Sequence, residues 1–253
     1  MNELVSVIVP VYNAGRVLKE TISSVLKQSY RPLELLLVND ASTDDSYDAA
    51  APFLASADDA ARIRWIENTG KHGACHARNL GTENASGRYI CFLDADDLWD
   101  PEKLEKQTAF MERTHAAFSF TGYEFADENG KGLKKFVRVP DTLIYEEALK
   151  NTTIFTSTVM FDMTLLNKQE IRMPQIESED TATWWRILKS GVTAYGLDES
   201  LTLYRRSRGT LSSDKRTAVR RIWRLYREAE GLSVLKSAYC FVFWAVRAVL
   251  RRL

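Results

Sequence analysis

Apolar runs alternate with helical segments over the first hundred residues, and this order limits the fold most strongly. Strands rich in β-branched and large apolar residues are predicted over 4–12, 33–40, 63–68 and 88–97. Helices are predicted between them, over 13–30, about 44–57 and 74–85. Strands that are apolar throughout are buried on both faces, as in parallel sheets. The order therefore predicts an α/β fold, with an open, mostly parallel sheet flanked by helices.

The remaining chain gives weaker signals. Further strands are predicted over 116–127 and 156–162, two short ones within 193–206, and a helix over 177–191. Residues 133–150 are irregular, with a hairpin and a short helix as the best interpretation. From 213 the chain is predicted to be helical in two pieces that break near Gly231. No internal repeat is found.

The charge of the chain is balanced overall but unevenly distributed. The 253 residues contain 34 Lys/Arg and 34 Asp/Glu. Residues 205–253 contain 13 basic and 3 acidic residues, whereas the remainder contains 21 basic and 31 acidic residues. Such an asymmetry suggests that the C-terminal segment meets an anionic surface.

Three cysteines, Cys75, Cys91 and Cys240, have no metal-type spacing, and their odd number argues against a disulfide framework. The opening residues lack the pattern of a signal peptide, and no apolar run reaches the length of a spanning helix. We therefore expect a cytoplasmic protein in a reducing compartment.

Polar residues follow several of the predicted strands at the point where each strand ends. Tyr12 and Asn13 follow the first strand, Asp40 the second, and Asp94–Asp97 the fourth. In open α/β sheets, ligands bind beyond the carboxyl ends of the strands. These residues are therefore expected to share one cleft.

The stretch "FLDADDLW" (92–99) ends a buried strand in three carboxylates, which folding alone does not favour. Asp94 and Asp96 form a D-x-D pair that can present oxygens to Mg²⁺ or Mn²⁺, with substrate phosphates completing the shell. The alternative is a helix cap, although Asp100 before Pro101 already supplies one. Neither a G-x-G-x-x-G nor a P-loop motif is present, so a metal is expected to hold the phosphates.

Five ordered motifs resemble the family 2 glycosyltransferases. They are "VSVIVPVYN", "LLLVNDASTDDS", "GACHARNLG", "ICFLDADDLW" and "SEDTATWWRILKSG", and the resemblance covers roughly residues 4–205. It implies the Rossmann-like nucleotide-sugar-binding fold called GT-A. It also implies a non-processive bacterial enzyme of the polysaccharide- or O-antigen-building kind, because the Q-x-x-R-W motif and multiple spans of processive relatives are absent.

The resemblance assigns the first two strand ends to the nucleotide base. Pro10 and Tyr12 would line the base, with the Tyr12 ring as a stacking surface, and Asp40 would accept a hydrogen bond from it, usually from uracil. The alternative for Tyr12 is a buried aromatic residue at a strand end.

The same resemblance assigns the acidic stretch to ribose and metal. Asp94 would contact the ribose, Asp96 would ligate the metal that bridges the diphosphate, and Asp97 would lie behind them. Arg78 would lie near the nucleotide. An ion pair of Arg78 with Asp40 or Asp94 is the alternative, and the two roles are compatible.

A later basic stretch, "YRRSRGTLS" (204–212), corresponds to a segment where relatives often carry Y-R-x-H. Arg205 and Arg208 are candidates for binding phosphate directly. The chain has Ser207 where that histidine stands in relatives, so the resemblance implies no histidine contact to the metal at this point.

Glu179–Asp180 matches the acidic pair of the family at the start of a helix, and the second acid, Asp180, would be the catalytic base. An inverting transfer needs one carboxylate to deprotonate the acceptor hydroxyl. The alternative is that these acids only favour the helix N-terminus. Trp184 and Trp185 follow, either against a sugar or in the core. Thr156 and Ser157 are candidates for the sugar pocket.

Residues 213–253 form a basic, amphipathic helical tail with about a dozen apolar residues between Ala238 and Leu250, too few to cross a bilayer. Basic flanks and interfacial aromatic residues favour a helix in the plane of an anionic membrane. Packing on the sheet and a dimer contact are the alternatives.

The sequence therefore predicts residues 1–212 as a GT-A domain, with a nucleotide-binding half (1–115) and an acceptor-binding half (116–212), and 213–253 as the tail. The expected activity is inverting, Mn²⁺- or Mg²⁺-dependent transfer of one sugar from a nucleotide-sugar, expected to be a UDP-sugar. The expected acceptor is a glycan on a polyprenyl diphosphate at the inner face of the membrane, and no nucleic acid partner is expected. The alternatives are a sugar-phosphate nucleotidyltransferase and a non-catalytic, membrane-docked binding protein.

Overall fold

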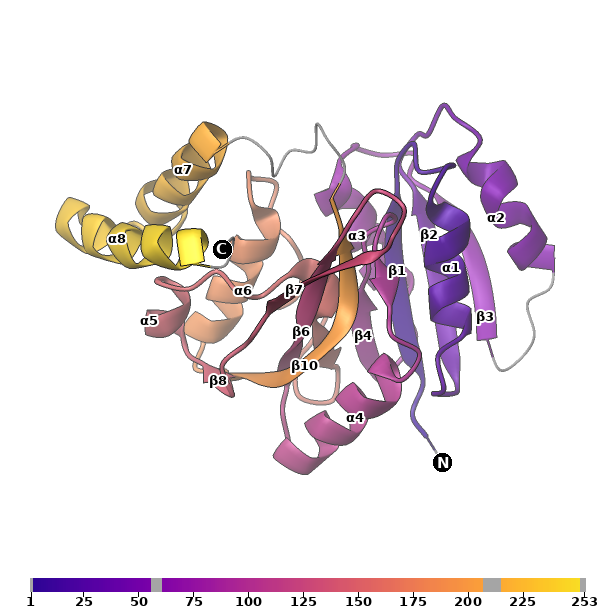
Figure 1. Cartoon of the computed structure of the whole chain (residues 1–253), viewed down its shortest axis with the longest axis horizontal. Helices are drawn as coiled ribbons and strands as arrows, with labels where there is room; N and C mark the ends of the chain where they lie inside the picture. The colour runs from indigo at the N-terminus through magenta and orange to yellow at the C-terminus, as the bar shows by residue number, and fades with distance from the viewer. Residues whose placement is uncertain (1, 56–60, 207–214, 251–253) are drawn as a thin grey trace.

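The computed structural model describes residues 2–55, 61–206 and 215–250, and it has an α/β fold with one large sheet (Figure 1). The strands are β1 (Val5–Val11), β2 (Leu33–Asn39), β3 (Ala61–Glu67), β4 (Tyr89–Phe92), β5 (Leu98–Trp99), β6 (Phe118–Ala126), β7 (Gly132–Val137), β8 (Thr142–Leu143), β9 (Met160–Asp162) and β10 (Ala194–Arg205). The helices are α1 (Leu18–Leu26), α2 (Ser46–Ala55), α3 (Ala74–Asn84), α4 (Lys103–Thr114), α5 (Tyr145–Ala148), α6 (Glu179–Lys189), α7 (Lys215–Arg224) and α8 (Val234–Leu250). A 3₁₀ turn, η1 (Thr156–Thr158), and a π-helix, η2 (Leu225–Ala229), complete the elements.

The sheet has the order β3-β2-β1-β4-β9-β6-β10-β5, and its main strands are parallel. Strands β1 to β4 pair in parallel, and β9 is antiparallel to both β4 and β6. Strand β6 therefore runs in the same direction as β4, and β10 is parallel to β6. The carboxyl ends of six strands consequently meet at one edge, which confirms the prediction of an open, mostly parallel sheet.

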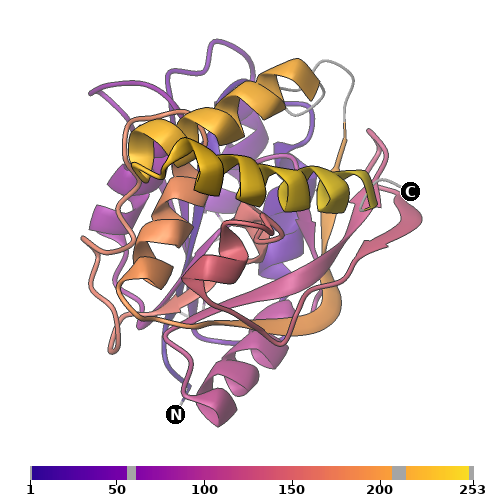
Figure 2. The same ribbon diagram turned by 90° about the vertical axis from the view of Figure 1, so that its left-hand side faces the viewer.

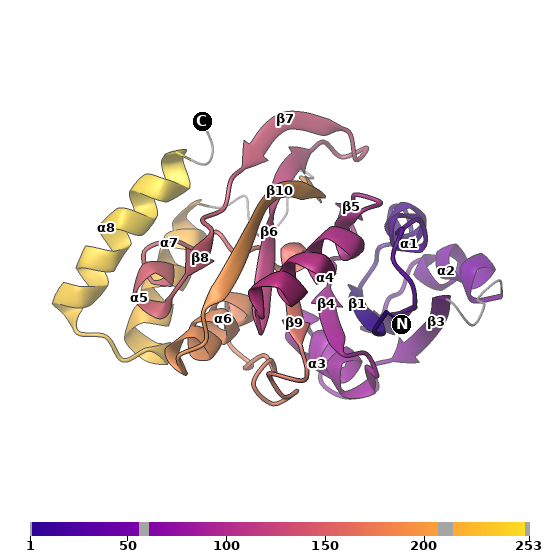
Figure 3. The same ribbon diagram turned by 90° about the horizontal axis from the view of Figure 1, so that it is seen from below.

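Helices cover both faces of the sheet, as Figure 3 shows from below. Val7 and Val9 of β1 contact the core shared with α1, α2 and α4, whereas Ile8 contacts the core shared with α3 and α6. Because neither face meets water, the residues of β1 and β2 are mostly apolar and, apart from the half-buried Pro10, buried. The buried Ser6 hydroxyl donates a hydrogen bond to the Glu34 carboxylate.

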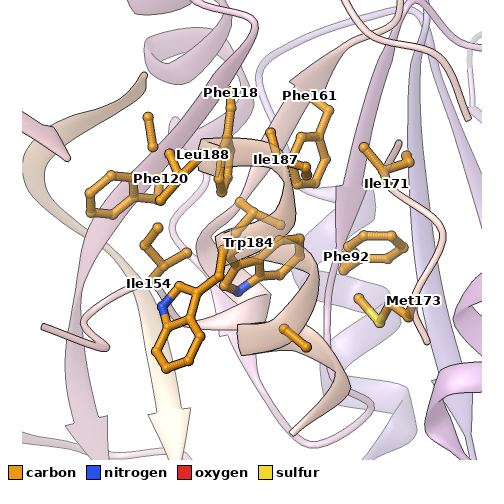
Figure 4. Close-up of a cluster of buried hydrophobic side chains, with 14 of the residues drawn as sticks. Phe92, Phe118, Phe120, Ile154, Phe161, Ile171, Met173, Trp184, Ile187 and Leu188 are labelled. Carbon is orange, nitrogen blue, oxygen red and sulfur yellow. The ribbon is translucent and has the colours of Figure 1, made fainter. Parts of the chain in front are cut away.

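The larger core lies between the sheet and α6, and Figure 4 shows part of it. Phe118 stacks on Phe161 with ring centroids 4.7 Å apart, and Trp184 packs on both rings. Trp184 and Trp185 are 2% and 1% exposed. Both tryptophans therefore belong to the core, which decides between the two interpretations of the sequence.

Several predicted elements differ from the structure. The strand predicted over 88–97 ends at Phe92, and the first residues of the strand predicted over 156–162 form the turn η1. The first helix begins at Leu18 instead of residue 13, because Asn13 has a φ of 48° and its side chain accepts a hydrogen bond from the Thr43 N–H at 2.8 Å. Residues 194–205 form one strand instead of two, since the register against β6 shifts but pairing resumes beyond Ser200.

The C-terminal segment breaks as predicted, with Gly231 in the left-handed region at a φ of 63°. It packs on the domain, because the Tyr226 ring stacks on Trp185 with centroids 5.4 Å apart and an interplanar angle of 7°. In Figure 2, which faces this end of the molecule, α7 and α8 lie across the front. Among the residues that the structure describes, no helix combines the length and apolarity needed to span a bilayer.

Candidate functional site

A pocket of about 1160 Å³ opens at the carboxyl edge of the sheet. It is lined by residues from the ends of β1, β2, β6 and β10, from the start of α3 and from the turn after β4. The predicted site residues that line it are Pro10, Tyr12, Asp40, Arg78, Asp94, Asp96 and Arg205. The tertiary structure thus brings together residues that are up to 195 positions apart, as the strand-end rule requires.

Tyr12 lies in the open part of this pocket. Its side chain is 65% exposed, although it directly follows β1, in which every residue but Pro10 is buried. The alternative of a buried aromatic residue at the strand end is therefore wrong. An exposed ring beside the half-buried Pro10 offers an apolar surface to a planar ligand.

Asp40 is held rigidly where β2 meets the first turn of α3. Its Oδ1 accepts a hydrogen bond from Asn68 Nδ2 at 2.7 Å and lies 3.2 Å from His72 Nδ1. Its Oδ2 accepts the Gly73 N–H at 2.6 Å, and Gly73 has a φ of 118° that favours glycine. This set of donors fixes the orientation of the carboxylate at the pocket wall.

The turn after β4 is anchored from beneath by Asp97, which is fully buried. Its Oδ2 accepts the Ser157 hydroxyl at 2.6 Å, and its Oδ1 accepts the Arg205 N–H at 3.0 Å. Ser157 in turn accepts the Asp94 N–H at 3.0 Å. Burial, with Asp94 and Asp96 nearby, raises the pKa of Asp97 well above its ordinary value. Asp97 therefore positions the turn instead of facing a ligand.

Asp96 lines the pocket, and in the part of the chain that the structure describes its carboxylate forms no ion pair, although the charge of Arg205 acts on it. Burial, followed by the charge of Asp94, raises its pKa to about 6. Within the described ranges no other residue donates a hydrogen bond to its carboxylate. An ionised carboxylate in this position gains from a hard cation, so Asp96 fits a divalent metal. Across residues 2–55, 61–206 and 215–250, no group of three or more His, Cys, Asp or Glu side chains is arranged to hold a metal ion. A metal at Asp96 would therefore need oxygens from a bound substrate to complete its coordination.

Arg78 joins the acidic turn to the start of α6. Its Nη2 lies 2.6 Å from Asp94 Oδ1, and its Nη1 lies 3.0 Å from Glu179 Oε1. These two carboxylates raise the pKa of the buried guanidinium, although burial opposes them. Of the two ion pairs offered by the sequence, the one with Asp94 is present, and Glu179 is a second partner that was not predicted.

Asp180 lies in the first turn of α6, next to Glu179, and outside the lining of the pocket. Its Oδ2 accepts the Thr156 hydroxyl at 3.0 Å, and its Oδ1 accepts the Thr181 N–H at 2.6 Å. Burial and the neighbouring Asp180 raise the pKa of Glu179. Because Arg78 pairs with Glu179, the negative charge of Asp180 is less neutralised than that of Glu179.

Arg205, the last residue of β10, also lines the pocket. It is 4% exposed, and its Nη2 lies 2.6 Å from Glu20 Oε2 while its Nη1 donates to the Glu128 carbonyl at 3.2 Å. Its guanidinium is thus partly neutralised before any ligand arrives. Arg208 lies outside the described residues.

Several lining residues were missed from sequence. They are Glu20, His72, Glu128 and Asn129. Glu128 and Asn129 belong to the polar turn "ENGKG", which directly follows β6, so the strand-end rule applied to that strand would have found them. Glu20 lies in the first helix and has no comparable signal.

The comparisons with known proteins agree with this geometry. The model of the family "Glycosyl transferase family 2" matches residues 6–169. The chain is 43% identical over 251 residues to the glycosyltransferase TuaG of Bacillus subtilis (strain 168), whose name refers to teichuronic acid biosynthesis, covering 99% of this chain and 98% of TuaG. It is 38% identical over 221 residues to the Escherichia coli UDP-Glc:alpha-D-GlcNAc-diphosphoundecaprenol beta-1,3-glucosyltransferase WfgD, covering 87% and 84%.

Solved structures resemble the fold at low sequence identity. S. aureus TarS 1–349 in complex with UDP aligns with a TM-score of 0.69 and 19% identity, covering 95% of this chain and 69% of TarS. The mannosyltransferase PcManGT of Pyrobaculum calidifontis, in complex with GDP-Man and Mn²⁺, aligns with a TM-score of 0.72 and 18% identity, covering 97% and 74%. The fold is of the GT-A type, and the chain belongs to glycosyl transferase family 2 and is a glycosyltransferase.

Proposed function

We propose that this glycosyltransferase is inverting and metal-dependent, and that it transfers one sugar from a UDP-sugar to a lipid-linked glycan. The product belongs to the synthesis of a bacterial surface polysaccharide. The Arg78 bridge carries this proposal, because one guanidinium joins Asp94 of the acidic turn to Glu179 beside Asp180. A donor-side acid and a candidate base thereby share one rigid frame.

The pocket is suited to a nucleoside diphosphate. Its volume of about 1160 Å³ is sufficient for a nucleotide-sugar, with Tyr12 and Asp40 offering a ring and an acceptor to the base. Asp94 would contact the ribose. The TarS complexes with UDP and UDP-GlcNAc support a uridine donor. Arg205 would attract the diphosphate, and Arg208 is proposed for the same role from its place in the sequence.

Asp96 would hold Mn²⁺ or Mg²⁺ together with the diphosphate oxygens. Such a cation, when bound, stabilises the charge that develops on the departing diphosphate. Mn²⁺ in the PcManGT complex supports this assignment. The Asp96 carboxylate, which accepts no hydrogen bond from another described residue, is the feature of this chain that fits it.

Asp180 would act as the base. Its Oδ2, held by the Thr156 hydroxyl at 3.0 Å, would accept the proton of the acceptor hydroxyl as that oxygen attacks the anomeric carbon from the face opposite the diphosphate. The carbon–oxygen bond to the diphosphate breaks as the new glycosidic bond forms, and the configuration is inverted. One carboxylate suffices because no protein acid is needed by the diphosphate leaving group.

The acceptor would be a glycan on a polyprenyl diphosphate. WfgD, at 38% identity, is named for such an acceptor. An acceptor embedded in the membrane requires the enzyme to work at the bilayer surface, so we also propose peripheral association with the inner face of the membrane through the basic C-terminal tail. Membership of a glycosyltransferase family removes the two alternatives, a nucleotidyltransferase and a non-catalytic binding protein.

Two variants test the site. UDP with Mn²⁺ should raise the thermal unfolding temperature of the wild type, because a ligand that binds the folded state stabilises it. Asp96→Asn should lose this stabilisation and its turnover of UDP-glucose or UDP-GlcNAc. Asp180→Asn should keep the stabilisation but lose turnover by about 10²-fold or more, since a general base contributes about that much.

Three outcomes would contradict the proposal. Equal stabilisation by UDP in the presence of Mn²⁺ and of a chelator would contradict the proposed role of the metal. Loss of UDP binding in Asp180→Asn would contradict the assignment of Asp180 as the base. A product that retains the anomeric configuration of the donor, seen by NMR with a GlcNAc-diphosphate lipid as acceptor, would remove inversion.

A further inference from the structure

Exposed apolar side chains are concentrated at the C-terminal end of the molecule. Of fifteen large hydrophobic side chains that are exposed among the described residues, eight lie between Val219 and Val246. Monomeric soluble proteins seldom expose contiguous apolar surface without a function for it. This concentration therefore calls for a partner.

The exposed residues of α8 form one stripe. Leu235, Tyr239, Val242 and Val246 are spaced four, three and four positions apart, so they lie on one face of the helix, with Phe243 beside them. Their exposed fractions include 84% for Leu235 and 59% for Val242. We call these five residues the α8 outer face. An ordinary surface helix shows polar residues there, so the usual pattern is reversed.

Helix α7 extends this surface. Trp223 is 36% exposed and contacts the Phe241 ring edge-on, with centroids 6.1 Å apart. Val219 lies one turn earlier on α7 and is 43% exposed. The apolar area thus continues from α8 onto the neighbouring helix.

The charge around this surface is positive. Residues 215–250 contain eight basic and two acidic residues. One of the acids, Glu230, is turned inward, where it accepts hydrogen bonds from Lys189 and Tyr145. Lys236 and Arg247 lie on the same flank of α8, one near each end. Lys236 Nζ pairs with Glu146 at 2.8 Å and Arg247 contacts the domain, so the net positive charge comes from the whole set of basic residues in this segment.

The opposite face of α8 is attached to the domain. Ser237 and Cys240 are buried, and Trp244 Nε1 donates to Thr152 Oγ1 at 2.9 Å. Arg247 donates to the Lys150 carbonyl at 3.0 Å. The helix is therefore packed on the domain along one side and exposed along the other. Packing on the protein, which the sequence offered as an alternative to membrane binding, leaves the exposed side available to a partner.

We propose that the α8 outer face is a membrane-docking face that inserts into an anionic leaflet with the helix axis parallel to the bilayer. Its apolar stripe, positive rim and lack of any acidic residue within 234–250 match a lipid surface with negative headgroups. The net charge of residues 215–250 is positive, which favours an anionic lipid surface over an uncharged one.

This face is rigidly connected to the catalytic frame. Tyr226, just before α8, stacks on Trp185 of α6, and the first turn of α6 carries Asp180. Docking of α8 therefore sets the height and orientation of Asp180 above the membrane. The inference about Asp180 rests on the proposed function, in which Asp180 is the base. The docking of α8 on a membrane does not rest on it.

Vesicle binding tests the face. Wild-type protein should sediment with vesicles of phosphatidylethanolamine and phosphatidylglycerol, and much less with phosphatidylcholine. The triple variant Leu235→Ser, Val242→Ser, Val246→Ser should bind about tenfold or more weakly, because three apolar side chains no longer leave water for the bilayer. Leu165→Ser, at a residue 55% exposed outside the tail, is the matched control and should bind like the wild type.

A labelled variant separates insertion from adsorption. The three native cysteines are buried, so Val242→Cys can be labelled selectively with an environment-sensitive fluorophore. Its emission should shift to the blue on addition of the anionic vesicles, and a label at Leu165→Cys should not shift.

Each contrary result has a definite meaning. Undiminished vesicle binding by the triple variant, or an unshifted label at position 242, would overturn insertion. A wild-type dimer that the triple variant converts to a monomer, without vesicle binding by either, would assign the face to a second copy of the chain. Stabilisation by UDP and Mn²⁺, measured on the same samples, reports the donor site separately, so failure of the proposed function is distinguishable.

Discussion

The Thr156 hydroxyl donates a hydrogen bond of 3.0 Å to Oδ2 of Asp180, and this contact links the turn η1 to the first turn of α6. The next residue, Ser157, donates to Asp97 beneath the acidic turn. Two successive residues of one short turn therefore hold the candidate base and the anchor of the candidate metal site. Displacement of η1 would disturb both.

Replacing Thr156 tests the first of these contacts. Thr156→Val keeps the shape of the side chain but removes the hydrogen bond to a charged oxygen, which is worth about 1.5–3 kcal/mol. We expect turnover to fall by about tenfold to hundredfold, with stabilisation by UDP and Mn²⁺ unchanged. Thr156→Ser retains the hydroxyl and serves as the control. Equal turnover in Thr156→Val and the wild type would show that Asp180 needs no orientation.

Replacing Arg78 tests the bridge between the two halves of the site. Arg78→Met leaves Asp94 and Glu179 without their shared cation, which costs about 2–4 kcal/mol of unfolding free energy. The cost falls below that of a fully buried pair because these side chains stay 26% and 20% exposed. Urea denaturation should give the loss, with Arg78→Lys intermediate. A loss below about 1 kcal/mol would contradict the structural role.

Replacing Tyr226 tests how firmly the C-terminal helices belong to the domain. The Tyr226 ring stacks on Trp185, and its hydroxyl donates to the Leu149 carbonyl at 2.5 Å. Tyr226→Ala should lower the unfolding free energy by about 3–5 kcal/mol. Tyr226→Phe, which loses only the hydrogen bond, should cost about 1 kcal/mol. Unfolding of the tail before the domain, at unchanged domain stability, would contradict this packing.

Lys103 predicts a dependence of stability on pH. It is fully buried beneath the site, with its Nζ 2.6 Å from Gln107 Oε1 and 4.1 Å from the centroid of Trp99. Burial lowers its pKa to about 8. Between that value and the ordinary lysine pKa of about 10.4, the unfolded chain binds more protons than the folded one, so the unfolding free energy rises with pH.

The difference between wild type and Lys103→Met isolates this effect. Relative to the variant, the wild type should gain about 1 kcal/mol or more between pH 7 and pH 9.5, as measured by urea denaturation. The gain should level off once the unfolded lysine also loses its proton. A constant difference across this range would show that Lys103 keeps its ordinary pKa.

Most of the candidate site could be predicted because its residues follow strands. Tyr12, Asp40, Asp94 and Asp96 each stand just beyond a strand whose apolar run is visible in the sequence, and parallel strands end at one edge. Glu20 and His72 could not be found in this way. They reach the pocket from a helix and from a loop, and only the packing of those elements against the sheet places them there.

The alternatives that the sequence left open were decided by burial and partner choice. Tyr12 is exposed, and Trp184 and Trp185 are buried, although all three are aromatic residues within family motifs. Arg78 pairs with Asp94 and Glu179, which lie 16 and 101 positions away. Periodicity predicts which face of an element is apolar, but it does not specify which distant side chain meets that face.

The sequence by itself determined the order of strands and helices, the family and the acidic turn, because these depend on local pattern and on residue identity at short spacing. Only the tertiary structure decided that Arg78 spans the two acidic segments and that α8 is packed on one face and open on the other. Such contacts join segments far apart in the chain, and their geometry follows from the packing of the whole sheet and its helices.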